Sequence, residues 1–268
     1  MAAPSPDTVD GWALVTGGSS GLGRAVAVAL SRRGYGVVVA ARRKERLDEV
    51  VGAAPGPAAA VVVDLERTAE IGPALEAGLV GAGIAPESIR IVVNNAGAGS
   101  FGRFAEEDPE ATRRTIRLGV DAPAAVAAWA IPHLRRGGGG VICNVSSVAA
   151  FTPGPLMASY YAAKSWLLSF GESLHEELKP EGIAVVTACP GPFASEFHRG
   201  AGIDVGRLGA LPTADRVAEG VVRAIYRRRP VAPIGFFPRL WAVVGPRLPR
   251  AWSRRIVYAL QRRREPPA

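Results

Sequence analysis

Short apolar runs alternate along the chain with longer segments whose apolar residues recur at helical spacing. The runs are almost continuous in Val, Ile and Ala, which predicts strands buried on both faces of a sheet. The expected strands are residues 12–16, 36–40, 59–64, 89–95, 140–147 and 183–190. The expected helices lie near residues 21–33, 43–52, 67–82, 108–136, 158–179 and 213–228.

This regular alternation indicates right-handed crossovers and hence parallel strands. The predicted fold class is α/β, with a single Rossmann-type, doubly wound parallel β-sheet covered by helices on both faces. No Gly/Ser or Pro linker precedes about residue 230. We therefore expect one domain over residues 1–230, followed by a basic, Pro-punctuated extension over residues 231–268.

Composition excludes several classes of protein. The 268 residues are 48% hydrophobic and 21% charged, which excludes disorder and a fibre. The apolar runs are too short for a bilayer, and residues 1–10 lack both basic charge and an apolar core, so we expect a soluble, unprocessed, cytoplasmic protein. Cys143 and Cys189 stand in separate apolar segments, which predicts buried free thiols with no disulfide framework and no metal site.

The net charge of +8 is concentrated at the C-terminus. Residues 238–268 hold eight arginines against one acid, Glu265. We favour a solvated tail, and no nucleic-acid-binding motif accompanies it. Residues 236–260 also interleave aromatic side chains with arginines, a composition suited to an anionic membrane surface or an apolar substrate lid. Pro246 and Pro249 exclude one long amphipathic helix, so peripheral membrane contact is the less favoured alternative.

A glycine-rich turn, TGGSSGLGR, follows the first strand directly and opens a helix. Gly17 allows the tight turn, Gly21 lets the backbone approach a pyrophosphate, and Gly23 permits close helix packing. The helix N-terminus adds free N–H groups and positive potential. This position in a strand–turn–helix unit favours dinucleotide binding over a merely flexible turn. The candidate contacts here are Gly17, Ser19, Ser20, Gly21, Leu22, Gly23 and Arg24.

The end of the second strand predicts which dinucleotide binds. NAD-specific folds usually place an acid there, whereas this chain has Arg42 and Arg43. Both can pair with a 2′-phosphate, Arg24 can approach from the glycine loop, and no carboxylate repels the phosphate. The alternative is that the arginines only begin a solvated helix, in which Lys44 and Asp48 form an i,i+4 pair. We favour NADP(H).

Residues that can perform proton chemistry lie between positions 146 and 164. Tyr160 and Lys164 are four apart, so they share a helical face. The lysine charge, together with an oxidised nicotinamide ring, is expected to lower the pKa of Tyr160 and let it exchange a proton near neutrality. Ser146 and Ser147 end a strand, where a hydroxyl can donate to a substrate carbonyl.

These motifs, in this order, resemble the classical short-chain dehydrogenase/reductase family. The resemblance covers about residues 10–230 and rests on TGGSSGLG, Asp64, NNAG (94–97), the serine pair, YYAAK (160–164) and PGP (190–192). It implies that Ser147 orients the substrate, Tyr160 is the general acid/base, and Lys164 binds the nicotinamide ribose and tunes the tyrosine. Family spacing places the tyrosine thirteen positions after the serine, which matches Ser147 with Tyr160 and leaves Ser146 structural.

The resemblance also implies cofactor contacts outside the glycine loop. Asp64 would contact adenine, Asn94 the adenosine side, and Pro190 with Gly191 the nicotinamide. The further candidates are Leu65, Ala96 and Gly97.

One position departs from the family pattern. The family's long fourth-crossover helix carries an asparagine that organises a proton relay to the lysine, and Gly119 occupies that position here. Pro123 has no N–H for the Gly119 carbonyl, so the two residues together could distort the helix by backbone means. The alternative is that they simply kink a surface-facing helix.

The sequence therefore predicts an NADPH-dependent carbonyl reductase, equivalently an alcohol dehydrogenase, that needs no metal. Residues 192–212, where the family has its substrate loop, mix Phe, Leu and Gly with few charges, which favours a small to medium, partly apolar ketone or secondary alcohol. A non-catalytic NADP-binding protein with a degraded relay is the competing interpretation. The apolar helices 108–136 and 158–179 pack against their copies in the family, which implies a homodimer or homotetramer.

Overall fold

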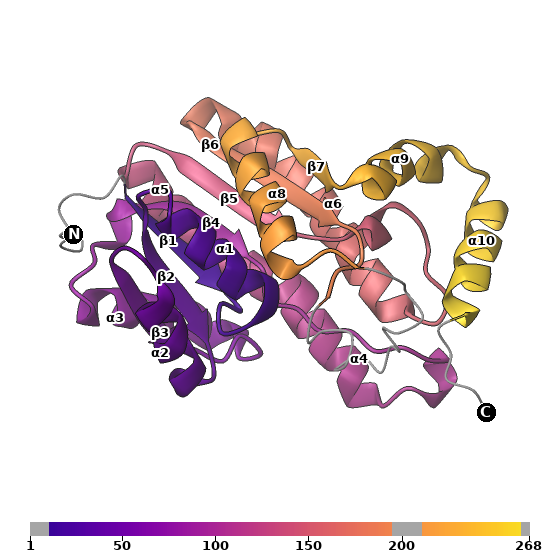
Figure 1. The fold of residues 1–268 in the computed structure, drawn as a ribbon, viewed down its shortest axis with the longest axis horizontal. Coiled ribbons are helices and arrows are strands. Elements are labelled where there is room, and N and C mark those ends of the chain that lie inside the picture. Colours follow the sequence, from indigo (N-terminus) through magenta and orange to yellow (C-terminus); the bar gives the residue numbers. More distant parts are fainter. Residues whose placement is uncertain (1–10, 195–210, 264–268) are drawn as a thin grey trace.

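Seven parallel strands form one sheet within residues 11–194 and 211–263, the part of the chain that this computed structural model describes. Their order is β3-β2-β1-β4-β5-β6-β7 (Figure 1). The strands are β1 (Trp12–Thr16), β2 (Gly36–Ala41), β3 (Ala58–Val62), β4 (Ile89–Asn94), β5 (Gly140–Val145), β6 (Ile183–Pro190) and β7 (Val231–Ile234). Strand order reverses between β1 and β4, so the sheet is doubly wound as predicted.

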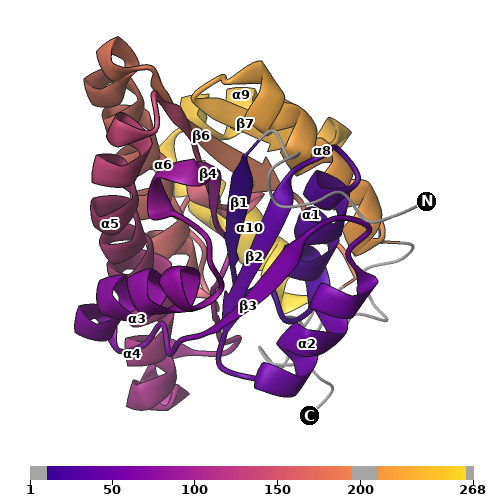
Figure 2. The same cartoon turned by 90° about the vertical axis from the view of Figure 1, so that its left-hand side faces the viewer.

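Helices cover both faces of this sheet. Figure 2 shows α1, α2 and α8 on one side and α3, α5 and α6 on the other. The main helices are α1 (Gly21–Ser31), α2 (Lys44–Ala53), α3 (Thr68–Gly81), α4 (Pro109–Ile116), α5 (Ala122–Arg136), α6 (Ala158–Leu178), α8 (Ala214–Arg227), α9 (Phe236–Val244) and α10 (Arg250–Arg262). The predicted fold class is thus confirmed.

Alternate strand residues pack into two separate cores. In β1, Ala13 and Val15 join the core beneath α1 and α8, while Trp12 and Leu14 join the core beneath α3 and α5. A strand that buries side chains on both faces must be apolar at every position, which explains the continuous runs in the sequence. Each fully buried Leu or Val side chain contributes about 1.5–3 kcal/mol to folding.

The last strand and the helices after it were not predicted. Val231–Ile234 pairs with the end of β6 as β7, so the first residues of the expected extension belong to the sheet. The segment that begins at residue 231 therefore starts with a strand of the sheet. That the residues after β7 form a separate extension stays a prediction. Pro249 precedes α10 and Pro246 lies between α9 and α10, which confirms that prolines prevent one long helix.

One expectation falls largely outside the described residues. The substrate loop expected at residues 192–212 is described only at its two ends. In the described part of the chain, no helix combines the length and the apolar character needed to cross a bilayer.

Candidate functional site

A cavity of about 660 Å³ lies at the carboxyl edge of the sheet. Most of the predicted site residues line it, because the loops that follow parallel strands meet at this edge. Those residues are Gly17, Ser19, Ser20, Gly21, Leu22, Arg42, Arg43, Asp64, Leu65, Ala96, Gly97, Ser147, Tyr160, Lys164, Pro190 and Gly191. Three of the residues proposed for cofactor binding, Gly23, Arg24 and Asn94, do not line the cavity.

The glycine loop forms an open cradle at the start of α1. Gly17 has a φ of +63°, and a Cβ there would come within 2.9 Å of the Ala96 backbone. Gly21 has a φ of +53° and faces open space, with no atom within 4 Å of a Cβ built on it. Ser20, the N-cap residue of α1, makes no side-chain capping bond, so its hydroxyl leaves the helix N–H groups available. The positive potential at the N-terminus of α1 and the exposed backbone of the glycine loop suit a pyrophosphate.

Gly23 and Asn95 pack against the glycine loop and hold it in place. A Cβ on Gly23 would come within 2.4 Å of both the Gly17 oxygen and the Asn95 amide. The Asn95 amide donates to the Thr16 carbonyl at 3.0 Å, an interaction that sequence reasoning missed. Asn94 is instead buried and donates to Asn144 Oδ1 at 3.0 Å. The alternation of side chains along a strand could have distinguished Asn94 from Asn95, because neighbouring residues of a strand point to opposite faces.

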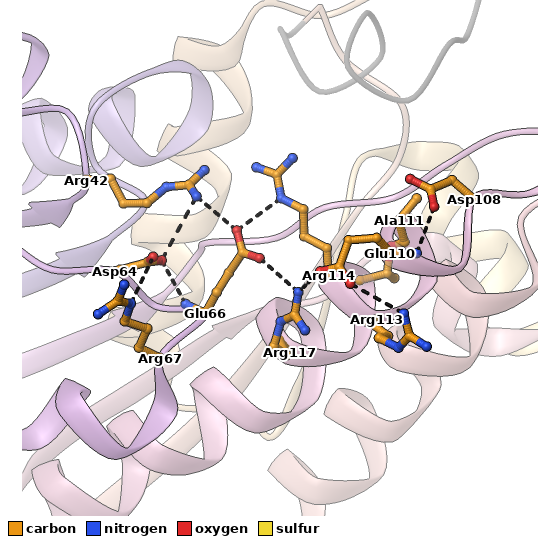
Figure 3. Close-up of polar contacts among 11 residues, drawn as sticks. Arg42, Asp64, Glu66, Arg67, Asp108, Glu110, Ala111, Arg113, Arg114 and Arg117 are labelled. Carbon is orange, nitrogen blue, oxygen red and sulfur yellow. Dashed lines mark hydrogen bonds and ion pairs between the residues drawn. The ribbon is translucent and has the colours of Figure 1, made fainter.

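Three arginines line the β2–β3 end of the cavity. Arg42 follows β2 and Arg114 lies on α4, and both contact Glu66, at 3.0 and 3.2 Å. Figure 3 shows Glu66 between Arg42 on one side and Arg114 and Arg117 on the other; Arg117, the residue after α4, contacts Glu66 at 3.3 Å. Sequence reasoning did not foresee Glu66, which reaches Arg42 from the loop after β3. Glu66 does not itself line the cavity, however.

The third arginine is Arg43, which points toward the glycine loop. Its guanidinium donates to the hydroxyls of Ser19 and Ser20, at 3.2 and 3.4 Å. Among the charged residues that line this end of the cavity, Arg42, Arg43 and Arg114 face a single acid, Asp64. The local charge is therefore positive, which suits an anionic group such as a phosphate.

Ser147, Tyr160 and Lys164 come together where β5 and α6 meet the cavity. Ser147 follows β5 and caps a short 3₁₀ turn, Val148–Phe151, by accepting from the Ala149 N–H at 3.2 Å. Its hydroxyl also hydrogen-bonds to the Tyr160 phenol. Lys164 Nζ lies 5.7 Å from the centre of the Tyr160 ring, on the shared helix face that the sequence predicted.

The protein environment raises the pKa of Tyr160 and lowers that of Lys164. Burial raises the pKa of Tyr160 to about 12, only partly opposed by the Ser147 hydrogen bond. The cause is that a buried phenolate loses its solvation, and the lowering expected in the complex with an oxidised nicotinamide stays a prediction. Burial also lowers the pKa of Lys164 to about 8. Near neutral pH the phenol is therefore protonated and can act as an acid.

The backbone of β5 and the serine beside Ser147 fix the position of the lysine. Lys164 Nζ donates to the Val145 carbonyl at 2.9 Å. Ser146 is buried, and its hydroxyl donates to the main-chain carbonyl of Lys164 at 2.9 Å. Ser146 thus ties α6 to β5, in agreement with the structural role expected for it.

The helix that departs from the family pattern contains a turn of π-helix. Arg117–Asp121 is π-helical between α4 and α5, and the Ala122 N–H bonds to the Arg117 carbonyl five residues earlier. Gly119 and Pro123 are both buried, so a kink on the surface is the wrong interpretation. A Cβ on Gly119 would come within 2.9 Å of the Ala163 Cβ, next to Lys164. The distortion therefore lies directly against the candidate catalytic helix.

The opposite end of the cavity is largely apolar and is built by the C-terminal helices. The sequence suggested an apolar substrate lid in residues 236–260 but did not predict which of these residues line the cavity. The lining residues from this region are Phe237, Trp241, Val257, Leu260 and Gln261. Phe193 completes the apolar wall from the segment after β6.

Comparison with known proteins agrees with this architecture. The family model for short chain dehydrogenases matches residues 11–204. "Probable oxidoreductase EphD" of Mycobacterium tuberculosis is 29% identical over 86% of this chain, which spans 42% of that relative's length. The chain thus covers less than half of the first curated relatives it matches.

Two solved structures are similar to this chain over nearly their whole length. A short-chain dehydrogenase from Sphingobium yanoikuyae in complex with NADPH is 31% identical, with a TM-score of 0.74, over 88% of this chain and 93% of that one. A 3-ketoacyl-(acyl-carrier-protein) reductase from Brucella melitensis complexed with NADH is 28% identical, with a TM-score of 0.75, over 84% and 97%. With the doubly wound sheet, the glycine cradle and the family match in agreement, this chain belongs to the short-chain dehydrogenase family of oxidoreductases.

Proposed function

We propose that this oxidoreductase is an NADPH-dependent carbonyl reductase, which in the reverse direction oxidises a secondary alcohol. The observation that carries the proposal is the pairing of Ser147, Tyr160 and Lys164 with an arginine-lined, glycine-cradled cavity of about 660 Å³. The strand order separates the two ends of the cavity, since Arg42 and Arg43 follow β2 whereas Tyr160 lies by β5 and β6. A dinucleotide would extend between them.

The glycine loop and the arginines at the β2–β3 end of the cavity support NADP(H) as the cofactor. Gly17 and Gly21 would leave room for the pyrophosphate, and Arg42 and Arg43 would bind the 2′-phosphate. Arg114 adds positive charge at the same end. One solved relative binds NADPH and another NADH, so the arginines rather than the family support the choice of NADPH.

When bound, the reduced nicotinamide supplies a hydride to the carbonyl carbon of the substrate. Ser147 donates a hydrogen bond to the carbonyl oxygen and orients it. Tyr160 donates its proton to that oxygen as negative charge develops, which completes the alcohol. Lys164 stabilises the phenolate that remains, and solvent then returns a proton to Tyr160. The apolar wall around Trp241 and Val257 favours a small to medium, partly apolar ketone.

The decisive experiment measures NADPH oxidation by the purified protein over a panel of aldehydes and ketones of increasing size. Turnover that disappears in Tyr160→Phe would support the reductase. NADPH binding in calorimetry without turnover on any carbonyl would instead favour a non-catalytic NADP-binding protein. The buried π-helical turn at Gly119 argues against a decayed relay, since the local distortion persists without an asparagine.

A further inference from the structure

Exposed apolar side chains gather on the C-terminal arm, which we define as residues 236–263, comprising α9 and α10. Among the described residues, fourteen large hydrophobic side chains are exposed, and nine of them belong to this arm. They are Phe236, Phe237, Leu240, Val243, Val244, Trp252, Ile256, Tyr258 and Leu260. Figure 1 shows both helices beyond β7, at the end of the molecule opposite α2 and α3. Concentrations of this kind mark interaction surfaces.

The outward face of α9 is the apolar one. At 100° per residue, Phe236, Leu240 and Val243 share one face, and Pro238 lies on the opposite, buried face. Phe236 is 85% exposed. An ordinary surface helix shows the reverse arrangement, with its apolar stripe toward the core. Helix α9 therefore exposes to solvent the apolar face that most surface helices bury.

Helix α10 packs on the protein through one stripe of residues and leaves a second, apolar stripe exposed. Ser253, Val257 and Gln261 recur every four residues and are buried. The residue before each of them forms a second stripe, 100° around the helix, which is exposed. That second stripe is Trp252, Ile256 and Leu260. Trp252 is 61% exposed, so its large ring has little contact with the protein.

The charge of the arm is of one sign. Its seven arginines are all exposed, and it contains no aspartate, glutamate or lysine. They are Arg239, Arg247, Arg250, Arg254, Arg255, Arg262 and Arg263. Exposed aromatic and aliphatic side chains flanked by arginines are typical of helices that lie in the headgroup layer of anionic membranes. Two copies that met through this face about a two-fold axis would oppose arginines with arginines.

The arm also borders the cavity. Phe237 and Leu260 line the cavity wall and are exposed as well, so they lie at its rim. A surface that bound the arm would therefore face the cavity entrance. An apolar carbonyl compound dissolved in that surface would reach the apolar cavity wall without crossing bulk water.

We propose that the C-terminal arm docks this protein on the surface of an anionic lipid bilayer. The outward face of α9 and the exposed stripe of α10 enter the headgroup region, and the arginines pair with lipid phosphates. The proposal goes beyond the reductase function and does not depend on it, because it concerns residues that do not touch the proposed reacting atoms.

The test is flotation of the full-length protein with vesicles. Vesicles of equal phosphatidylglycerol and phosphatidylcholine are expected to carry the protein upward, and vesicles of phosphatidylcholine alone are not. Phe236→Ser combined with Leu240→Ser, and separately Arg254→Glu combined with Arg255→Glu, are each expected to reduce partitioning about ten-fold or more. High salt is expected to release the wild type, since charges are screened over about 3 Å at 1 M.

Control substitutions outside the arm test whether the effects are specific to it. Val80→Ser and Arg229→Glu change an exposed apolar and an exposed basic residue outside the arm, and we expect both to float like the wild type. None of the substituted residues lines the cavity, so turnover of a water-soluble ketone without vesicles checks that each variant is folded. If the wild type proved inactive, the flotation result would still stand by itself.

Three outcomes would overturn the proposal. The first is a wild type that does not float with anionic vesicles. The second is flotation that the arm variants retain. The third is a change of oligomeric mass in light scattering for Phe236→Ser with Leu240→Ser, which would assign the apolar face to a contact with a second copy of the chain.

Discussion

Gln261 Nε2 donates a hydrogen bond of 2.9 Å to the hydroxyl oxygen of Tyr161. The bond joins α10 to α6 across the apolar part of the cavity, between residues 100 positions apart. Tyr160, one residue earlier, bonds instead to Ser147. Two adjacent tyrosines that both line the cavity thus have different hydrogen-bond partners.

Replacing each tyrosine by phenylalanine separates these roles. Tyr160→Phe is expected to lower the rate of carbonyl reduction by about 100- to 10,000-fold, the usual contribution of general acid catalysis. Tyr161→Phe loses one hydrogen bond and about 1 kcal/mol of stability. NADPH binding by calorimetry is expected to stay intact in both variants. Inactivation by Tyr161→Phe instead would show that the acid is the second tyrosine.

The pKa of Lys164 predicts how reduction depends on pH. Its depressed pKa of about 8 means that the ammonium is present below that pH and lost above it. The pKa of Tyr160, raised to about 12, keeps the phenol protonated throughout this range. We therefore expect kcat/KM for reduction to fall as pH rises above about 8, because the nascent phenolate loses its neighbouring charge.

Lys164→Met is the control for this pH profile. Its reduction rate is expected to be low and to lack the inflection near 8. An inflection that persisted in this variant would belong to a different group.

Arg43 is expected to determine the preference for NADPH. Charge-assisted bonds to a phosphate predict that NADPH binds more tightly than NADH by about 1–3 kcal/mol. Arg43→Ala is expected to remove much of that difference in calorimetry. Arg32→Ala is the matched control, because Arg32 is exposed at the opposite end of α1. Equal dissociation constants for the two cofactors in the wild type would contradict the prediction.

The π-helical turn predicts a role for Pro123. If the distorted backbone at Gly119 serves proton transfer to Lys164, Pro123→Ala restores a helical N–H, relaxes the turn and slows reduction without weakening NADPH binding. Unchanged turnover in single-turnover kinetics would refute this.

A second variant, Gly119→Asn, tests the same turn by introducing the asparagine that the family carries at this position. The added side chain would meet Ala163, so we expect it to lower the melting temperature rather than improve the relay. A faster and equally stable Gly119→Asn enzyme would mean that the distortion is dispensable.

Assembly is expected to be a homodimer or a homotetramer. Helices α5 and α6 carry half-buried apolar residues, including the stacked rings of Trp166 and Phe170 with centroids 4.6 Å apart. In this family these helices pack against their copies. A monomeric mass in light scattering at micromolar concentration would refute the prediction.

Local pattern determined most of the fold and the proposed catalytic residues. Continuous apolar runs such as the Val and Ala residues of β2 must be buried on both faces, which predicts a parallel sheet covered by helices on both sides. The spacing of Tyr160 and Lys164 on a helix, and the glycines after β1, likewise depend on neighbours in the chain. These inferences needed no knowledge of distant contacts.

Tertiary structure decided what depends on residues far apart in the sequence. Glu66 meets Arg42 and Arg114, and Gln261 meets Tyr161, only because separate loops converge at one edge of the sheet. The pKa of Tyr160 rises because folding removes water from the phenol, an effect that spacing does not report. The outward apolar face of α9 also follows from packing, since the sequence shows that the helix is amphipathic but not which of its faces the rest of the protein covers.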